Sequence, residues 1–180
     1  MSVFEEILSI YESRGASAYY GEPVSMTEHG LQAAHFAQAE AAPPELVVAA
    51  LLHDIGHLLE PVPDDIADWK LDARHEEVGS RWLAARLHAP VAAAVRLHVP
   101  AKRYLCATDA HYGAQLSPAS IVTLELQGGP MSARELSAFE REPYHREALR
   151  VRRWDDQGKV AGLKTAALRD YRALVEALVK

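Results

Sequence analysis

The chain has 180 residues, of which 19 are lysine or arginine and 25 are aspartate or glutamate, giving a formal net charge of -6. This length predicts one domain with a sizeable core. The acidic balance, without any basic tract, argues against nucleic acid as a partner. The single cysteine, Cys106, excludes a disulfide within the chain and fits a reducing compartment.

No apolar stretch approaches the ~20 residues that a membrane helix needs. The first residues are acidic and lack the basic, apolar pattern of an export signal. We therefore expect a cytoplasmic protein without membrane association. The sequence favours no particular oligomeric state.

Apolar residues recur at helical spacing along almost the whole chain, and no segment alternates with period two. The expected helices cover 3–15, 26–41, 44–59, 73–87, 90–98, 101–111, 117–127, 132 onward, 144–154 and 166–179. Ser25 or Thr27 can cap the second helix, and Pro100 should interrupt the fifth. Other signals at helix ends are the Pro43-Pro44 start, the 61–65 loop and a capping box at 132–135. The fold class is therefore all-α.

A His53-Asp54 dipeptide lies inside the apolar helical run Leu51–Leu59. The imidazole and the carboxylate can both bind a metal, and the carboxylate can bridge two ions. A carboxylate among apolar residues needs a partner, because an unpaired buried charge costs free energy. Taken alone, the dipeptide fits an exposed helix end equally well.

Four of the nine histidines, His29, His53, His75 and His98, fall on successive predicted helices at intervals of 22 to 24 residues. Antiparallel helices with this spacing can each deliver one side chain to a common centre, as in the metal sites of helical bundles. A core or surface role is the ordinary alternative for any one histidine. The regular spacing and the neighbouring Asp54 favour a metal centre.

Three further side chains lie about one helical turn from a proposed ligand, which holds them beside it. They are His57 after His53, Lys102 after His98, and Arg152 before Asp155. Converging cationic and hydrogen-bonding groups are what a phosphonate or phosphate dianion requires. The alternative for Lys102 and Arg152 is a solvated helix face.

The sequence resembles the HD-domain proteins, whose pattern of His, His-Asp and a later Asp is met by His29, His53-Asp54 and Asp155. The further histidines, His75 and His98, resemble the di-iron oxygenase branch, which includes myo-inositol oxygenase and the phosphonate-cleaving oxygenases of the PhnZ type. The resemblance to the PhnZ type covers nearly the whole chain. Its most specific strings are Lys102-Arg103-Tyr104-Leu105 and Gln127-Gly128-Gly129-Pro130-Met131.

The resemblance implies a single HD-domain helical bundle over 1–180 with a di-metal site at its centre. The metal-binding core would span about 26–156, the N-terminal helix and a lid loop 1–25, and a C-terminal helix 165–179. One iron would be held by His29, His53 and Asp155 and the other by His75 and His98, with Asp54 as the bridge.

The same resemblance implies that His57, Lys102, Ser120 and Arg152 contact the phosphonate. In the PhnZ type, the residue that matches Tyr19 occupies an iron position until substrate displaces it, and the residue that matches Glu22 faces the substrate amine. Asp54, Tyr19 and Glu22 are therefore the expected catalytic residues, with Tyr19 and Glu22 also contacting substrate. Tyr20, beside them, would stack on a cation or simply pack.

The implied activity is that of a mixed-valent Fe(II)/Fe(III) dioxygenase with O2 as co-substrate. It would cleave the carbon–phosphorus bond of an α-hydroxyphosphonate such as 2-amino-1-hydroxyethylphosphonate or its N-trimethylated analogue, giving phosphate and glycine or glycine betaine. A carboxylate beside aromatic rings suits a primary ammonium and a methylated one alike.

Two other classes remain open. The first is a metal-dependent HD phosphohydrolase that acts on a phosphate monoester or nucleotide, where two metals activate water. Its phosphoryl-binding groups would be the same, so Lys102 and Arg152 do not separate it from the oxygenase. His75, His98 and the loop with Tyr19 and Glu22 favour the oxygenase. The second is a metal-stabilised binding protein without turnover, which the many converging polar groups disfavour.

Overall fold

The structure is a computed structural model that describes residues 1–19, 21–59 and 74–180. Its α-helices are α1 (Val3–Arg14), α2 (Met26–Ala39), α3 (Pro44–Leu52), α4 (Ile55–Leu59), α5 (His75–Ala84), α6 (Ala89–Thr108), α7 (Ala110–Ala114), α8 (Pro118–Leu126), α9 (Ala133–Phe139), α10 (His145–Gln157) and α11 (Arg172–Glu176). A 3-10 helix, Leu168–Tyr171, precedes α11. The described residues contain only isolated β-bridges and no strand, so the all-α prediction is confirmed.

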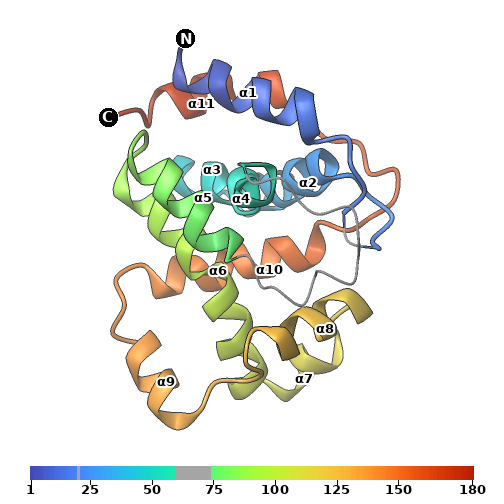
Figure 1. Ribbon diagram of the computed structural model, residues 1–180, viewed down its shortest axis with the longest axis vertical. Helices are drawn as coiled ribbons and strands as arrows, with labels where there is room; N and C mark the ends of the chain where they lie inside the picture. The colour runs from blue at the N-terminus through green and yellow to red at the C-terminus, as the bar shows by residue number, and fades with distance from the viewer. Residues whose placement is uncertain (20, 60–73) are drawn as a thin grey trace.

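The centre of the molecule is formed by α2, α3, α5, α6 and α10, which pack against one another (Figure 1). Every side chain of α3 from Leu46 to Leu52 is buried, as expected of a helix that is apolar all round and surrounded by others. Helices α1 and α11 cover one end of this core, beside both chain termini, and α7, α8 and α9 lie toward the other end. Among the described residues, no helix has the length and apolar character to cross a bilayer.

Side-chain caps set where the site-bearing helices begin. The Ser25 hydroxyl accepts a hydrogen bond from the Glu28 amide, and the Glu28 carboxylate accepts one from the Ser25 amide, which confirms Ser25 as the N-cap of α2. This cap fixes His29 at the end of the first turn, where it is fully buried. The predicted box at Ser132 and Glu135 is also confirmed, at the start of α9.

The helix predicted from 44 to 59 is wrong in one respect, because a turn at His53 and Asp54 divides it into α3 and α4. His53 Nδ1 lies 2.8 Å from the Ala50 carbonyl oxygen, the acceptor that the Asp54 amide would use in a continuous helix. The His57 amide instead bonds to the Asp54 carbonyl three residues back. The site dipeptide therefore occupies a corner between two helices.

The predicted break at Pro100 is also wrong, since α6 runs through it. A proline within a helix costs about 3 kcal/mol because it removes one backbone hydrogen bond and crowds the preceding turn. Here α6 packs against α5 and α10, and Leu97 and Ala101, which flank the proline in the sequence, are buried in a cluster with Phe139 and Ala148. Tertiary packing outweighs the local penalty.

The C-terminal helix predicted over 165–179 is shorter, comprising the 3-10 turn at Leu168–Tyr171 and α11. The Asp170 carboxylate accepts the Ala167 amide at 2.8 Å and so caps the turn at that point. Other helix ends differ from prediction by a few residues, as α5 does. The predicted loop at 61–65 and the expectation for Tyr20 lie outside the described residues.

Candidate metal centre

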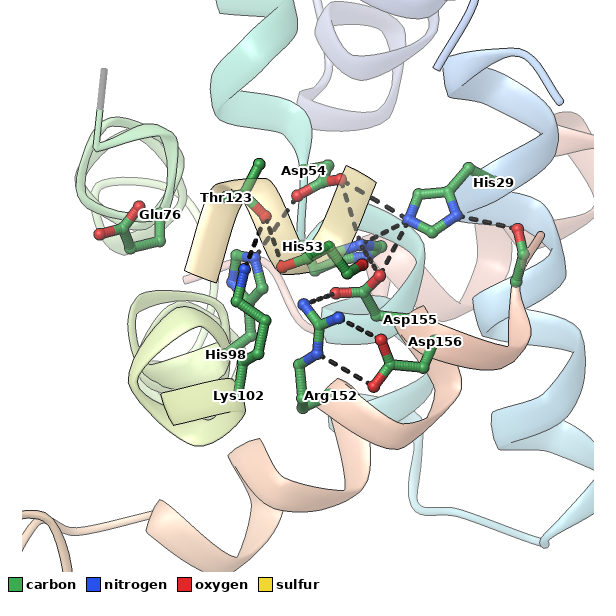
Figure 2. A network of polar contacts seen from close by, with 12 residues as sticks. His29, His53, Asp54, Glu76, His98, Lys102, Thr123, Arg152, Asp155 and Asp156 are labelled. Carbon is green, nitrogen blue, oxygen red and sulfur yellow. Dashed lines mark hydrogen bonds and ion pairs between the residues drawn. The ribbon is translucent and has the colours of Figure 1, made fainter. Parts of the chain in front are cut away.

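Six predicted ligands converge at the middle of the helical core from five different elements, and Figure 2 labels all of them except His75. They are His29 on α2, His53 and Asp54 at the α3–α4 corner, His75 at the start of α5, His98 on α6 and Asp155 on α10. All six side chains are buried. The one-per-helix spacing in the sequence therefore corresponds to a single cluster in space.

Backbone carbonyls orient the first pair of imidazoles. Nδ1 of His29 lies 2.8 Å from the Gly158 carbonyl, and Nδ1 of His53 lies 2.8 Å from the Ala50 carbonyl. A carbonyl can only accept, so each Nδ1 carries a proton and Nε2 is the ring nitrogen left to bind a metal or a second proton. These two Nε2 atoms are 3.0 Å apart. Two facing lone pairs need a proton or a metal ion between them.

The second pair also places two Nε2 atoms face to face, those of His75 and His98, 3.1 Å apart. His98 Nδ1 lies 2.7 Å from the Val95 carbonyl, and such an acceptor behind the ring, which fixes the tautomer, is typical of metal-binding histidines. The Nδ1 of His75 lies 3.6 Å from the Glu76 carboxylate, which is an ion-pair distance too long for a hydrogen bond.

The carboxylate of Asp54 lies between the two pairs. Its Oδ2 is 3.3 Å from His53 Nε2 and 3.6 Å from His29 Nε2. Its Oδ1 is 3.2 Å from His75 Nε2 and 3.4 Å from His98 Nε2. One oxygen therefore faces each histidine pair, which is the placement a bridging ligand requires.

Asp155 completes the first group, with its Oδ1 3.3 Å from His29 Nε2. Within the described residues, the buried Oδ1 of Asp155 and Oδ2 of Asp54 receive no hydrogen bond of normal geometry. Such orphaned buried acceptors are costly unless a cation fills the space they face. Two candidate three-ligand groups meet at Asp54: His29 with His53, and His75 with His98.

The charges of the clustered side chains also favour a bound cation. Burial alone would lower the pKa of His53, yet Asp54 and Asp155 raise it to about 9. Burial would also raise the pKa of Asp54, but His53 and hydrogen bonds from His75 and His98 hold it well below its usual range. The cluster thus keeps the Asp54 carboxylate negatively charged and stabilises a positive charge on the neighbouring His53. Nitrogen and oxygen donors without thiolate suit iron among the transition metals, so the residues fit two iron ions.

Tyr19 covers one face of this centre. Its ring stacks on His29 with the ring centroids 3.9 Å apart and the planes 17° from parallel. Burial, together with Asp54 and Asp155, raises the pKa of its phenol well above the usual value, so the hydroxyl keeps its proton. His57 occupies an equivalent place in the other group, stacked on His75 at 3.8 Å.

The predicted cations, Lys102 and Arg152, lie beside the cluster and differ in the hydrogen bonds that they make. Lys102 is 2% exposed, and its Nζ donates to Thr123 Oγ1 at 2.8 Å. Arg152 donates Nη1 to Asp155 Oδ2 at 2.6 Å and Nη2 to Asp156 (Figure 2). Its Nε lies 3.0 Å from the Tyr112 hydroxyl. Arg152 therefore orients Asp155 directly.

Ser120 and Glu22 meet through Lys159, a residue that sequence reasoning missed. Lys159 Nζ lies 2.9 Å from Ser120 Oγ and 3.4 Å from Glu22 Oε1. Lys159 comes four residues after Asp155, but α10 ends at Gln157, so the one-turn offset that places Lys102 beside His98 within a helix does not extend to it. The sequence therefore held no helical signal for Lys159. It held none for Tyr112, which contacts Arg152, either.

Comparison with known proteins agrees with this geometry. A profile of the HD domain matches residues 26–156. A hydroxymethylphosphonate dioxygenase of Gimesia maris is 43% identical over 183 residues, covering 98% of this chain and 89% of that protein. A glycine-betaine-forming 1-hydroxy-2-(trimethylamino)ethylphosphonate dioxygenase of Leisingera caerulea is 42% identical, covering 99% and 91%. An uncharacterized protein of Acanthamoeba polyphaga mimivirus is 36% identical, covering 94% and 78%.

These matches confirm the resemblance found in the sequence. The family profile spans well over half of the chain, and two relatives above 40% identity align over nearly all of it. The chain therefore belongs to the HD-domain family and, within it, to the group that includes these phosphonate dioxygenases.

Proposed function

We propose that the protein is a di-iron dioxygenase that cleaves the carbon–phosphorus bond of an α-hydroxyphosphonate. The main structural support is the position of the Asp54 carboxylate, which turns one oxygen toward each of the two histidine pairs. Beside that centre lie cationic and hydroxyl groups suited to a phosphonate. The names of both dioxygenase relatives support the same reaction.

The overall reaction balances with dioxygen alone. The C1–H and C–P bonds break and supply the electrons that reduce O2. One of its oxygen atoms forms a new bond to C1 and the other a new bond to phosphorus. The products are a carboxylic acid and phosphate. When bound, a mixed-valent Fe(II)/Fe(III) pair would supply the redox chemistry, held by His29, His53 and Asp155 on one side, His75 and His98 on the other, and Asp54 between.

The remaining side chains bind and orient the substrate. Lys102 and Ser120 would hold the phosphonate through a buried ammonium and a buried hydroxyl. His57 stacks on His75 and would offer a ring nitrogen on that side. Arg152 holds Asp155 with one of its N–H groups and adds positive charge behind the anion. Tyr19 covers His29 and would shield the centre from water before substrate enters.

Dioxygen dependence tests this function against the phosphohydrolase alternative. We expect protein purified without air to contain two irons per chain and to release phosphate from hydroxymethylphosphonate only when O2 is admitted, with one O2 consumed per phosphate. A phosphate monoester serves as the control substrate and should stay intact. Equal phosphate release under argon, or hydrolysis of the monoester, would instead assign the hydrolase reaction.

The charge of Lys102 predicts a pH dependence. Burial lowers the pKa of this ammonium to about 7, with Arg152 adding to the effect. Because the pKa is lowered, the charged form is present below pH 7 and is lost as pH rises. Each pH unit above 7 should therefore reduce kcat/KM about tenfold. Lys102→Arg keeps its charge throughout this range.

The measurement is kcat/KM from pH 6 to 9 for the wild type and for Lys102→Arg. Titration of the substrate phosphonate affects both proteins equally, so the ratio of their two profiles isolates Lys102. We expect the decline in the wild type and its absence in the arginine variant. Parallel profiles would show that Lys102 does not hold the phosphonate through its charge.

A further inference from the structure

The carboxylate of Glu22 already has a cationic partner within the chain. Lys159 Nζ lies 3.4 Å from Glu22 Oε1, and the two side chains are 11% and 12% exposed. Ser117 Oγ donates to the same Glu22 oxygen at 2.5 Å. The Lys159 ammonium also lies 5.9 Å from the centre of the Tyr19 ring.

A carboxylate next to an aromatic ring is the arrangement that binds an organic ammonium ion. In this protein the Lys159 ammonium fills the position such an ion would take, within reach of both Glu22 and the Tyr19 ring. A substrate with an ammonium tail would have to displace Lys159 from Glu22. It would leave the lysine charge poorly paired beside Lys102, which is costly in a partly buried site.

The backbone around Lys159 is held in place on both sides. The preceding Gly158 accepts a hydrogen bond from His29 Nδ1 at 2.8 Å. The following Val160 makes two hydrogen bonds to the Gln32 side chain, at 2.8 and 2.9 Å. Both neighbours of Lys159 are thus bonded to α2, one of them through the proposed metal ligand His29. The Lys159 side chain is 11% exposed, and its ammonium lies 2.9 Å from Ser120 Oγ, so the charge is held within the site.

We propose that Lys159 is a specificity-determining residue that occupies the cation position at Glu22, so that the enzyme takes hydroxyphosphonates without an ammonium tail. The substrate class is that of hydroxymethylphosphonate, which with O2 gives formate and phosphate. Glu22 then serves to pair Lys159 rather than to bind a substrate amine. This proposal rests on the proposed function above.

The first test compares three substrates with the wild-type protein. Hydroxymethylphosphonate has no tail, 2-amino-1-hydroxyethylphosphonate carries an ammonium, and 1-hydroxypropylphosphonate has the same shape as the amine with a methyl group in place of the charge. We expect kcat/KM for the amine to be on the order of 100-fold below that for its uncharged isostere. Equal values for amine and isostere would overturn the proposal.

The second test changes the preference between amine and isostere by substitution of Lys159. Lys159→Met frees Glu22, so kcat/KM for the amine relative to the isostere should rise about 100-fold. Lys159→Arg keeps the cation and should keep the wild-type ratio. In the double variant Lys159→Met with Glu22→Gln, the gain should disappear because the carboxylate that would accept the amine is gone. Iron content and circular dichroism report whether each variant is folded.

The outcomes separate this proposal from the proposed function. No O2-dependent phosphate release from any of the three substrates would defeat the function itself. Turnover of hydroxymethylphosphonate with an equally good amine would defeat only the role of Lys159. If Lys159 instead contacted the phosphonate, Lys159→Met would weaken all three substrates equally and leave their ratios unchanged, which would also overturn the proposal.

Discussion

Replacing Asp54 with asparagine is expected to remove both irons and to reduce phosphate release by more than 100-fold. Asparagine has nearly the same shape as aspartate but offers one neutral oxygen instead of two that share a negative charge. Each Asp54 oxygen lies 3.2 to 3.6 Å from the Nε2 atoms of one histidine pair. The effect should exceed the 10- to 100-fold loss that is typical when a residue behind a metal ligand is changed.

The matched control is Asp109→Asn, the same chemical change away from the centre. Asp109 caps α7 through hydrogen bonds to the His111 and Tyr112 amides, and asparagine caps a helix as well as aspartate does. Iron per chain, measured by elemental analysis, and phosphate release are determined for both variants. Two irons and near-normal turnover in Asp54→Asn would mean that the carboxylate is no bridge.

How far the sequence predicts the site follows from the geometry of helices. A side chain one turn from a ligand must lie on the same face, so the offsets alone identify Lys102 and Arg152 as neighbours of the centre. Both are buried there. Lys159 lies four residues after Asp155 but beyond the end of α10 at Gln157, so the rule does not reach it.

What the sequence could not provide are contacts that depend on tertiary packing. Nothing local indicates that Glu22 is paired with a lysine 137 positions further on, because that ion pair exists only once the N-terminal loop meets the end of α10. The path of α6 through Pro100 depends in the same way on α5 and α10. The cost of a proline inside a helix predicted a break there, but the packing of α6 against α5 and α10 keeps the helix continuous.

At His53 and Asp54 the sequence predicted the HD motif correctly but the helix around it wrongly. Apolar periodicity continues from Leu46 to Leu59 and predicts one helix. The His53 ring competes for the Ala50 carbonyl, which ends α3 at Leu52. The same hydrogen bond fixes the tautomer that turns Nε2 toward the centre. The hydrogen bond that interrupts the helix therefore also orients His53, the proposed ligand.

Gly56→Ala should lower the free energy of unfolding by about 3 kcal/mol, at the upper end for overpacking, and reduce the iron content. A Cβ atom on Gly56 would lie 1.9 Å from the His75 carbonyl oxygen and 3.0 Å from the Gly79 nitrogen. Both are backbone atoms, so relief requires α4 and α5 to move apart. That movement would carry His75 away from Asp54, while His29 and His53 stay in place. We therefore expect the iron content to fall from two ions per chain toward one.

Gly113→Ala is the matched control, because nothing lies within 4 Å of a Cβ atom at that position in α7. Alanine is the better helix former, so this variant should be as stable as the wild type or up to about 1 kcal/mol more stable. Denaturant unfolding of the metal-free proteins measures the packing effect without any contribution from iron binding. Iron counting then measures the displacement of His75 separately. Unfolding free energies that agree between Gly56→Ala and the wild type would show that α4 and α5 do not approach so closely at Gly56. A destabilised variant that keeps two irons would show instead that the strain relaxes without moving His75.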